Sequence, residues 1–429
     1  MTINVTDTVG ANNTIVLDGN SKIPAIDGSQ VTALDADVFT TGSLATARID
    51  VGTTAGKILQ LDSNAKIPAI SGANLTNAPG PTQSTSDPAI DTNLTLGAKW
   101  INKTSGEVYI CTDATAGENV WTNVGAGSGD VQPWAFQGES YGYTSGGWPN
   151  PPATDVIDKF SFTTDGNAVD VGNLTLARTD GCGLTSVSYG WTCGGRGTGW
   201  STQNNIIDKF AFASDGNATD SGDLLTNHTA MAGQSSTTYG YISGGKEPTA
   251  VNSIQKFAFA SGGNSSAISG VLTVARRSCQ GVSSETHAYT VGGSSPYSNV
   301  IDKFLFSTDA NSTDVGDLSN ARGQAAPTSS TTYGFIAGGA DSGTPPGANS
   351  IEKWSFASDA NATSHGNLSR ETFGVCGQSA TSYGYTSGGY VPNTYSNIID
   401  KYAYTSNTTA TDVGNLTVAR GDRPHGHQV

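Results

Sequence analysis

The C-terminal two-thirds of the chain consists of one sequence unit that is repeated six times. A Gly-Gly pair that closes an aromatic, strand-like segment returns about every 46 to 50 residues, a period typical of repeat architectures. The six pairs begin at Gly146, Gly194, Gly244, Gly292, Gly338 and Gly388. Ile-Asp-Lys-Phe or a close variant follows each pair, beginning at Ile157, Ile207, Ile254, Ile301, Ile351 and Ile399. A unit of this kind buries its apolar face against neighbouring units, which predicts a series of similar modules.

A third element, Asp-Val-Gly-Asn-Leu-x-x-Ala-Arg or a variant of it, completes each unit. It ends at Arg178, Arg276, Arg322 and Arg420, with His228 in the arginine position of the second unit and Arg370 slightly early in the fifth. The three elements keep the same order throughout. The sequence therefore predicts one structural module in six copies.

Alternation of side chains within the unit predicts short β-strands. In residues 239–244 the aromatic residues share one parity and the glycines the other, so one face of such a strand is bulky and the other is lean. Phe160 and Phe162 alternate in the same way in the strand that follows the Gly-Gly pair. With 55 glycines and only short apolar runs, the pattern predicts an all-β domain of four-stranded sheets that pack bulky face into lean face.

The order of these strands resembles the kelch family of β-propellers: an Arg-led first strand, an aromatic second strand that closes in Gly-Gly, an aromatic third strand and a fourth strand that leads to the next Arg. The resemblance implies that residues 129–429 form a six-bladed kelch-like β-propeller. Asp-x-Gly-Asn-Leu stands where the family usually has a Trp in the fourth strand. Because residues 132–138 match the Arg-led strand poorly, we expect the tail after Arg420 to lie beside the first unit.

Residues 1–80 are predicted to form an extended fibrous shaft. Leu-Asp-Gly-Asn-Ser-Lys-Ile-Pro-Ala-Ile at 17–26 is echoed about 44 residues later at 61–70. These segments hold too few apolar residues for a core of their own, so we expect other copies of the chain to complete it in a homotrimer. Residues 81–128 are predicted to hold a linker and a small β module, with strands at 99–103 and 107–111 around a Ser105-Gly106 turn and with Trp121 closing the module.

The Lys-Ile-Pro-Ala-Ile repeats and the segment Thr-Ser-Gly-Glu-Val-Tyr-Ile-Cys-Thr-Asp at 104–113 resemble parts of bacteriophage tail-fibre proteins. The resemblance implies a virion structural protein whose shaft binds other tail or adaptor proteins and whose head binds a host cell-surface glycan or protein. It also implies synthesis in the host cytoplasm and assembly into the virion. A capsid-attached head fibre or decoration protein is an alternative, and a propeller glycosidase or depolymerase is another.

Charge and hydropathy exclude two classes of partner. The formal net charge of −15 would repel phosphate backbones and anionic bilayers. The first residues carry neither the basic start nor the apolar core of a secretory signal, and no apolar run approaches the length of a membrane span. We therefore expect neither nucleic-acid binding nor membrane insertion.

No constellation of catalytic residues is visible, so we expect a binding protein without catalytic residues, cofactor or bound metal. The lysines that recur in every unit cannot each be a unique catalytic group, and we interpret them as scaffold: Lys159, Lys209, Lys256, Lys303, Lys353 and Lys401. His228, His287 and His365 stand where other units have Arg, Tyr and Val. His425 and His427 could bind a metal as a His-x-His pair, but we favour a flexible terminus.

Two further groups have both a plain and a functional interpretation. The five cysteines form no Cys-x-x-Cys, and we interpret them as packing residues: Cys111, Cys182, Cys193, Cys279 and Cys376. The Asp-Gly-Asn turns at 165–170 and 215–220 resemble oxygen-rich calcium loops, but they lack the closing Glu of such loops. Because Asp, Gly and Asn are also usual in tight hairpins, we prefer plain turns and keep calcium as the alternative.

The loops after the Gly-Gly pairs vary while the strands around them do not. They carry residues that occur in single units: Trp148, Arg196, Trp200, Lys246, Tyr297, Asp341, Tyr390 and Tyr395. Antiparallel strand order would bring these loops and the Arg-led connections to one rim, where aromatic rings could stack on sugars. We predict a receptor site there, with mere tolerance of the loops to sequence drift as the alternative.

Overall fold

The computed structural model describes residues 80–124, 135–149, 152–198, 202–341, 347–392 and 394–429. The predicted shaft, and the trimer it would form, lie outside the described residues except for Gly80. Every regular element in the described ranges is a β-strand, so the all-β prediction is confirmed there. These ranges hold no helix of the length and hydropathy that a membrane span requires.

Residues 80–124 form a small four-stranded sheet. It contains, in this order, β1 (Thr82–Ser84), β2 (Lys99–Asn102), β3 (Val108–Asp113) and β4 (Val120–Asn123). β2 and β3 form the predicted hairpin, with Trp100 opposite Tyr109. Tyr109 and Trp121 are fully buried, which agrees with the predicted role of Trp121 in closing the module.

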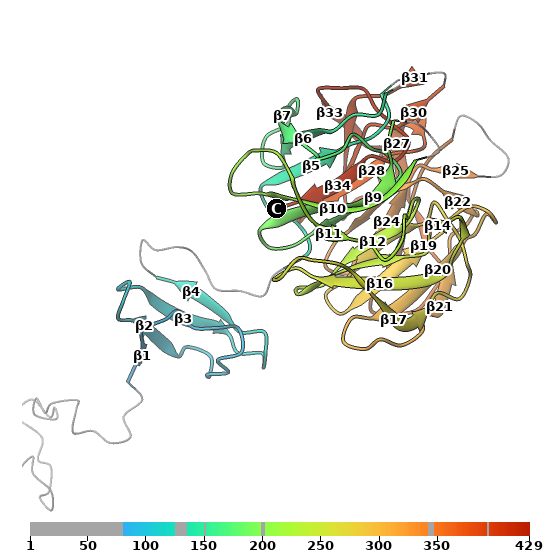
Figure 1. The fold of residues 1–429 in the computed structure, drawn as a ribbon. Coiled ribbons are helices and arrows are strands. Elements are labelled where there is room, and N and C mark those ends of the chain that lie inside the picture. The colour runs from blue at the N-terminus through green and yellow to red at the C-terminus, as the bar shows by residue number, and fades with distance from the viewer. Residues whose placement is uncertain (1–79, 125–134, 150–151, 199–201, 342–346, 393) are drawn as a thin grey trace, which may run out of the picture. The chain divides into compact units, whose positions relative to one another are not determined.

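The repeats fold into four-stranded antiparallel sheets, six of them within the described part of residues 135–429 (Figure 1). The first sheet contains β34 (His425–Gln428), β5 (Tyr141–Ser145), β6 (Val156–Ser161) and β7 (Val169–Asn173). The second contains β8 (Cys182–Thr185), β9 (Tyr189–Arg196), β10 (Gln203–Ala211) and β11 (Thr219–Asp223). The third contains β12 (Ala232–Ser235), β13 (Tyr239–Ser243), β16 (Ser253–Ala258) and β17 (Ser266–Val271).

The remaining three sheets follow the same order of strands. The fourth contains β18 (Gln280–Ser283), β19 (His287–Val291), β20 (Val300–Leu305) and β21 (Thr313–Asp317). The fifth contains β23 (Ala326–Ser329), β24 (Tyr333–Ala337), β26 (Ala348–Ser355) and β27 (Thr363–Thr372). The sixth contains β28 (Cys376–Ser379), β29 (Tyr383–Ser387), β32 (Ile398–Ala403) and β33 (Thr411–Asn415). Short two-stranded pairs join β14 (Lys246–Glu247) to β15 (Thr249–Ala250), β22 (Arg322–Gly323) to β25 (Ala340–Asp341), and β30 (Tyr390–Val391) to β31 (Thr394–Tyr395).

The tail of the chain completes the first sheet. β34 lies beside β5 (Figure 1). In this pairing His425 lies opposite Ser145 and Gln428 opposite Gly142. The predicted position of the tail beside the first unit is confirmed. His425 and His427 are 1% and 0% exposed. The expectation of a flexible terminus there is wrong, because pairing with β5 places both residues in the core.

One strand of each sheet lines a shared cavity of about 80 Å³, here called the inner cavity. We call these six strands, β34, β8, β12, β18, β23 and β28, the inner strands. Each inner strand contacts the inner strand of the next sheet, and β34 contacts both β8 and β28.

Glycine permits the close approach of the inner strands. The second residue of the inner strand is glycine in five sheets: Gly183, Gly233, Gly281, Gly377 and Gly426. A Cβ on Gly281 would lie 2.0 Å from the carbonyl oxygen of Gly233, and a Cβ on Gly426 would lie 2.0 Å from that of Gly377. Backbone atoms cannot move aside as a flexible side chain can, so these contacts require glycine.

Aromatic rings fill the space between neighbouring sheets. The Tyr241 ring of the third sheet lies 5.8 Å from that of Phe304 and 5.1 Å from that of Phe306 in the fourth, measured between centroids. On β13, a Cβ at Gly240 would lie 3.0 Å from the Phe257 ring of the same sheet. Equivalent contacts between sheets involve Tyr143, Trp191, Tyr289, Phe335 and Tyr385. The predicted face-to-face packing is present, but the bulky face meets an aromatic pair of the next sheet rather than a bare glycine face.

Replacing Tyr241 by Ala is expected to destabilise the repeat domain by about 3–5 kcal/mol, the range for deleting a packed aromatic side chain. The side chain is buried and its hydroxyl donates to the carbonyl oxygen of Phe306 at 2.9 Å. Phe212→Ala belongs to the same class, since Phe212 is buried against Tyr143. Urea unfolding measures the change, with the partly exposed Lys246 as control: Lys246→Ala should cost less than about 0.5 kcal/mol. Equally mild effects of all three substitutions would contradict the packing described above.

Candidate functional site

The loops after the Gly-Gly pairs meet the segments after the repeated arginines at one end of the sheets, here called the loop rim. Isolated β-bridges join Trp148 to Gly421, Thr179 to Arg196, Thr229 to Lys246, Arg277 to Ser294 and Phe373 to Tyr390. In the fifth sheet, β22 and β25 make the same contact. The predicted meeting of these two kinds of segment is confirmed in each sheet.

Backbone hydrogen bonds link the sheets to one another along the loop rim, in what we call the rim circuit. Its members have left-handed φ angles of 53° to 65°: Asp180, Ala230, Ser278, Gln324, Gly374 and Asp422. The Ala230 N–H donates to the carbonyl oxygen of Asp180 at 2.7 Å, and the Ser278 N–H to that of Ala230 at 2.7 Å. The same bond runs from Gln324 to Ser278, Gly374 to Gln324, Arg423 to Gly374 and Asp180 to Asp422. This backbone conformation is uncommon outside glycine, and here the bonds between sheets hold it in place.

Two carboxylates of the rim circuit lie beside two arginines. Asp180 is buried and forms ion pairs with Arg196 and Arg423. The Tyr395 hydroxyl donates to the Asp422 carboxylate at 3.4 Å. Burial, and then the charge of Asp180, raise the pKa of Asp422 to about 6. One carboxyl group of the loop rim therefore changes its protonation near neutral pH.

Asp422→Asn is expected to stabilise the protein above pH 7. Because the pKa of Asp422 is raised on folding, the folded protein holds this proton more tightly than the unfolded chain, and the wild type gains stability as the pH falls from about 7 through 6 toward 4. The shift from 3.8 to about 6 corresponds to at most about 3 kcal/mol. Asn cannot ionise, so the gain in unfolding free energy over the wild type should be largest above pH 7 and vanish near pH 4. A difference that does not change with pH would contradict this result.

A cleft of about 380 Å³ opens beside the rim circuit, here called the rim cleft. Among its polar lining are the side chains of Asp180, Arg196, Arg277, Tyr297 and Gln324. The Tyr297 side chain is 43% exposed. A cleft with a few convergent polar groups and an accessible aromatic ring is suited to a small polar ligand.

The predicted receptor residues do not form a single cluster. Arg196 and Tyr297 line the rim cleft. Lys246 and Asp341 lie on β14 and β25, at the loop rim but outside the lining of the cleft. Trp200 falls outside the described residues.

Three other aromatic residues of that prediction contribute to the structure of the rim. The Tyr390 and Tyr395 rings pack edge to face, with 5.3 Å between their centroids. Trp148, which we expected to offer a ring to a sugar, is only 3% exposed. Its burial corrects that expectation, and its replacement is expected to lower stability as well as any binding.

Each sheet also holds a buried polar contact, here called a clasp, to which the sequence analysis assigned no role. In the second sheet Asp208 is fully buried, and its carboxylate lies 3.1 Å from the Arg178 guanidinium. It also accepts hydrogen bonds from the Thr175 backbone N–H at 3.0 Å and from the Thr175 hydroxyl at 2.7 Å. Thr175 follows the last strand of the first sheet, so the clasp joins two sheets. Equivalent ion pairs join Arg276 to Asp302, Arg322 to Glu352, Arg370 to Asp400 and Arg420 to Asp158.

In the third sheet the clasp joins His228 to Gln255, and the carboxylate that pairs with His228 comes instead from Glu247, 3.0 Å from His228 Nδ1. Gln255 stands in the acidic position, and its amide nitrogen lies 3.1 Å from His228 Nδ1. In the sequence, the unit with His in place of Arg is followed directly by the unit with Gln in place of Asp. This joint replacement is the signal from which the pairing could have been inferred.

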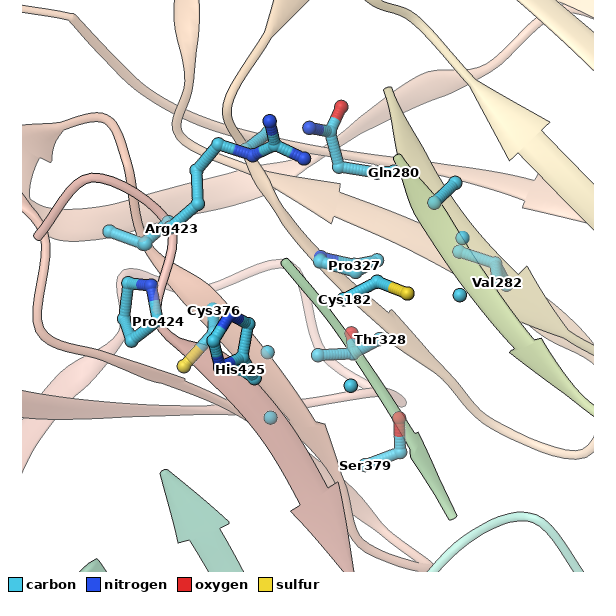
Figure 2. Close-up of a pocket in the computed structure, with 18 of the residues that line it drawn as sticks. Cys182, Gln280, Val282, Pro327, Thr328, Cys376, Ser379, Arg423, Pro424 and His425 are labelled. Carbon is cyan, nitrogen blue, oxygen red and sulfur yellow. The ribbon is translucent and has the colours of Figure 1, made fainter. Parts of the chain in front are cut away.

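The inner cavity offers few reactive groups. Figure 2 shows Arg423 and Gln280 toward one end of it and Ser379 toward the other. Burial raises the pKa of the Cys376 thiol and lowers the pKa of His425 well below its usual value, so both are neutral at pH 7. All five cysteines are free and buried, as predicted. The described ranges contain no group of three or more His, Cys, Asp or Glu side chains that could hold a metal ion.

The Asp-Gly-Asn turns connect neighbouring sheets. Asp215 accepts from the Lys159 ammonium at 3.0 Å and Asp165 from that of Lys401 at 2.9 Å. The Asn217 side-chain oxygen accepts from a backbone N–H of the adjoining sheet at 3.0 Å. These contacts favour the plain-turn interpretation, and they give the lysines a structural role.

No family model matches the chain, and no curated protein is significantly similar to it. The resemblances to kelch and tail-fibre proteins therefore rest on the motifs of this sequence alone.

Proposed function

We propose that residues 129–429 form a closed six-bladed β-propeller of the kelch type, with the six sheets as blades. Three observations support closure. The inner strands contact one another in an unbroken order that passes through β34. The rim circuit returns from Asp422 to Asp180, and β34 completes a sheet with strands from the other end of the repeats. Closure of this kind would give every blade two neighbours and would protect the sheet edges at the centre.

We propose that this propeller is the receptor-binding head of a bacteriophage tail fibre, which binds its ligand without transforming it. The proposal is carried by one observation: residues 135–138 attach to the sheets at one particular end. Gly138 bridges to Ala380, and its N–H donates to the carbonyl oxygen of Ser379 at 2.8 Å. Ala380 precedes β29, whereas the Gly388-Gly389 pair follows it, so residues 135–138 lie at the end opposite the loop rim. A shaft attached at that end would present the loop rim to the host.

The attachment point also lies near the common axis of the proposed propeller. Phe136 lines both the inner cavity and a second cavity next to it. Its carbonyl oxygen accepts from the Gln428 side chain at 3.0 Å, and the Gln137 side chain donates to Ser329 at 3.0 Å. Contacts to the inner strands of two sheets would fix the head on the axis of a shaft.

Residues 1–80 would form the shaft of a homotrimer and bind a tail or adaptor protein of the virion, with a capsid-attached head fibre or decoration protein as the alternative. Sedimentation of the full chain tests the oligomer: a trimer is expected, and a monomer at micromolar concentration would contradict it.

A glycosidase is the second candidate, and the carboxyl pair at the loop rim is the observation that favours it. A glycosidase uses two carboxyl groups, one of which needs a raised pKa to donate a proton. The pKa of Asp422 is raised, but Asp180 is engaged by two arginines. Release of reducing sugar ends from host polysaccharide, lost in Asp422→Asn, would favour the enzyme.

Immunogold electron microscopy of purified virions tests the proposed location. Antibodies raised against the repeat domain should label the free ends of the tail fibres. Label on the capsid would favour the decoration protein instead, and unlabelled virions would contradict a structural role in the particle.

A further inference from the structure

Arg277 differs from the other arginines of the described residues, because no Asp or Glu there forms an ion pair with it. Each of the others has such a partner: Arg178, Arg196, Arg276, Arg322, Arg370, Arg420 and Arg423. The rim-loop residues outside the described ranges, 150–151, 199–201, 342–346 and 393, contain no Asp or Glu in the sequence. An unpaired arginine is unexpected in a chain of net charge −15.

The structure holds Arg277 in a defined position in the rim cleft. Its backbone exchanges two hydrogen bonds with Ser294, of 3.1 and 2.6 Å. Its Nε donates to the Ser295 hydroxyl at 3.2 Å. Its two Nη groups have no hydrogen-bond partner among the described residues. The side chain is therefore anchored at Nε, and the fork of Nη donors is left for a ligand.

The surroundings of Arg277 favour a negatively charged ligand. Arg196 and Asp180 also line the rim cleft and form an ion pair, and Asp180 pairs with Arg423 as well. No carboxylate of the described residues is therefore left to pair with Arg277 in the cleft. The partly exposed side chain of Tyr297 lines the same cleft, and its ring offers an apolar face.

We propose that the rim cleft binds the oxyanion of an acidic saccharide, with Arg277 as the charged anchor and Tyr297 beside the sugar ring. The inference rests on the proposed role as a receptor-binding head, and it names the class of receptor. The planar guanidinium matches a carboxylate or a phosphate with two parallel N–H donors. The volume of about 380 Å³ lies at the lower end of ordinary ligand pockets, about 300–1,000 Å³, which suits one or two sugar residues.

Nuclear magnetic resonance of the ¹⁵N-labelled full chain tests the site. The Nε–Hε signal of Arg277, assigned by its loss in Arg277→Ala, is followed during titration at constant ionic strength. The probes are glucuronate, N-acetylneuraminate and glucose 6-phosphate, with glucose as the neutral control. Saturable shifts with an anionic sugar and none with glucose are expected, and comparison of the probes separates carboxylate from phosphate. An unmoved signal with every anionic sugar, or equal shifts with glucose, would overturn the proposal.

Two variants separate the site from general electrostatic attraction. Saturation-transfer measurements on the sugar should show at least about tenfold weaker binding to Arg277→Ala, since a charge-assisted contact is lost. Lys353→Ala removes a cation of β26 that is neither in the cleft lining nor among the predicted receptor residues, and it should bind as the wild type does. Equal binding by the wild type and Arg277→Ala would refute the assignment.

The two proposals can fail separately. If anionic sugars shift the Arg277 signal but the chain is absent from tail fibres, the saccharide site is supported and the tail-fibre proposal is contradicted. If the chain is present in tail fibres but no anionic sugar shifts the Arg277 signal, the tail-fibre proposal is supported and the saccharide site is contradicted.

Discussion

Removal of residues 425–429 is expected to unfold the repeat domain. The deletion removes β34, so β5 loses one of its two partner strands and the inner strands on either side lose their contacts with Gly426. It also removes His425 and His427, which are buried among the first two sheets and hydrogen-bond to Gly181 and Leu184 there. The combined loss is comparable with the whole stability of an ordinary domain, roughly 5–15 kcal/mol. We expect loss of near-ultraviolet circular dichroism and of the cooperative thermal transition.

A single substitution at the same place provides a graded test. Gly426→Ala would place a Cβ 2.0 Å from the carbonyl oxygen of Gly377, so the melting temperature should fall by several degrees or more. Gly216→Ala is the matched control, because nothing lies within 4 Å of the added Cβ. A truncated chain that kept its native spectrum and melting temperature would contradict closure through β34.

The second large effect is expected at the clasp of the second sheet. Asp208→Ala would leave the buried Arg178 charge without its carboxylate and would remove the acceptor of two Thr175 hydrogen bonds. Breaking a buried ion pair from one side costs about 3–5 kcal/mol. Lys159→Ala, which breaks an ion pair with the exposed Asp215, should cost less than about 1 kcal/mol. Urea unfolding compares the two variants.

The third sheet suggests a second substitution that should restore part of the stability lost at this clasp. The third sheet joins His228 to Gln255 where the other sheets join a basic to an acidic residue, and His228 also pairs with Glu247 there. The pair Arg178→His with Asp208→Gln should therefore recover part of the stability lost in Asp208→Ala. If the double variant loses as much stability as Arg178→His and Asp208→Gln lose separately in sum, the two positions are not coupled.

The strands and their order could be predicted because alternation and the repeat period are local features of the sequence. The place of the tail followed from a gap in the pattern, since residues 132–138 do not match an inner strand. The burial of His425 and His427 did not follow, because the end of a chain usually frays. Only the distant strand β5 gives these residues their partners.

The site was less accessible from sequence. Charged residues are mostly exposed, so burial of the Asp of Ile-Asp-Lys-Phe was not expected. Only the joint replacement that gives His228 and Gln255 signals its contact with an arginine. Loop variability pointed to the loop rim, but it could not show that Trp148 is buried. Nor could it show that Arg277 donates to Ser295 and has no acidic partner among the described residues. These properties depend on how segments from different sheets converge, which no single repeat encodes.

Competition for adsorption to host cells tests the central claim, that the loop rim binds the receptor. Tyr297→Ala at the rim cleft and Tyr333→Ala at the opposite end of the sheets remove tyrosines of similar exposure, 43% and 37%. Full-length wild type and Tyr333→Ala should block adsorption of the virus alike. Tyr297→Ala should block it at least about tenfold less well at an unchanged melting temperature. Equal blocking by the two variants, or loss only in Tyr333→Ala, would contradict the account.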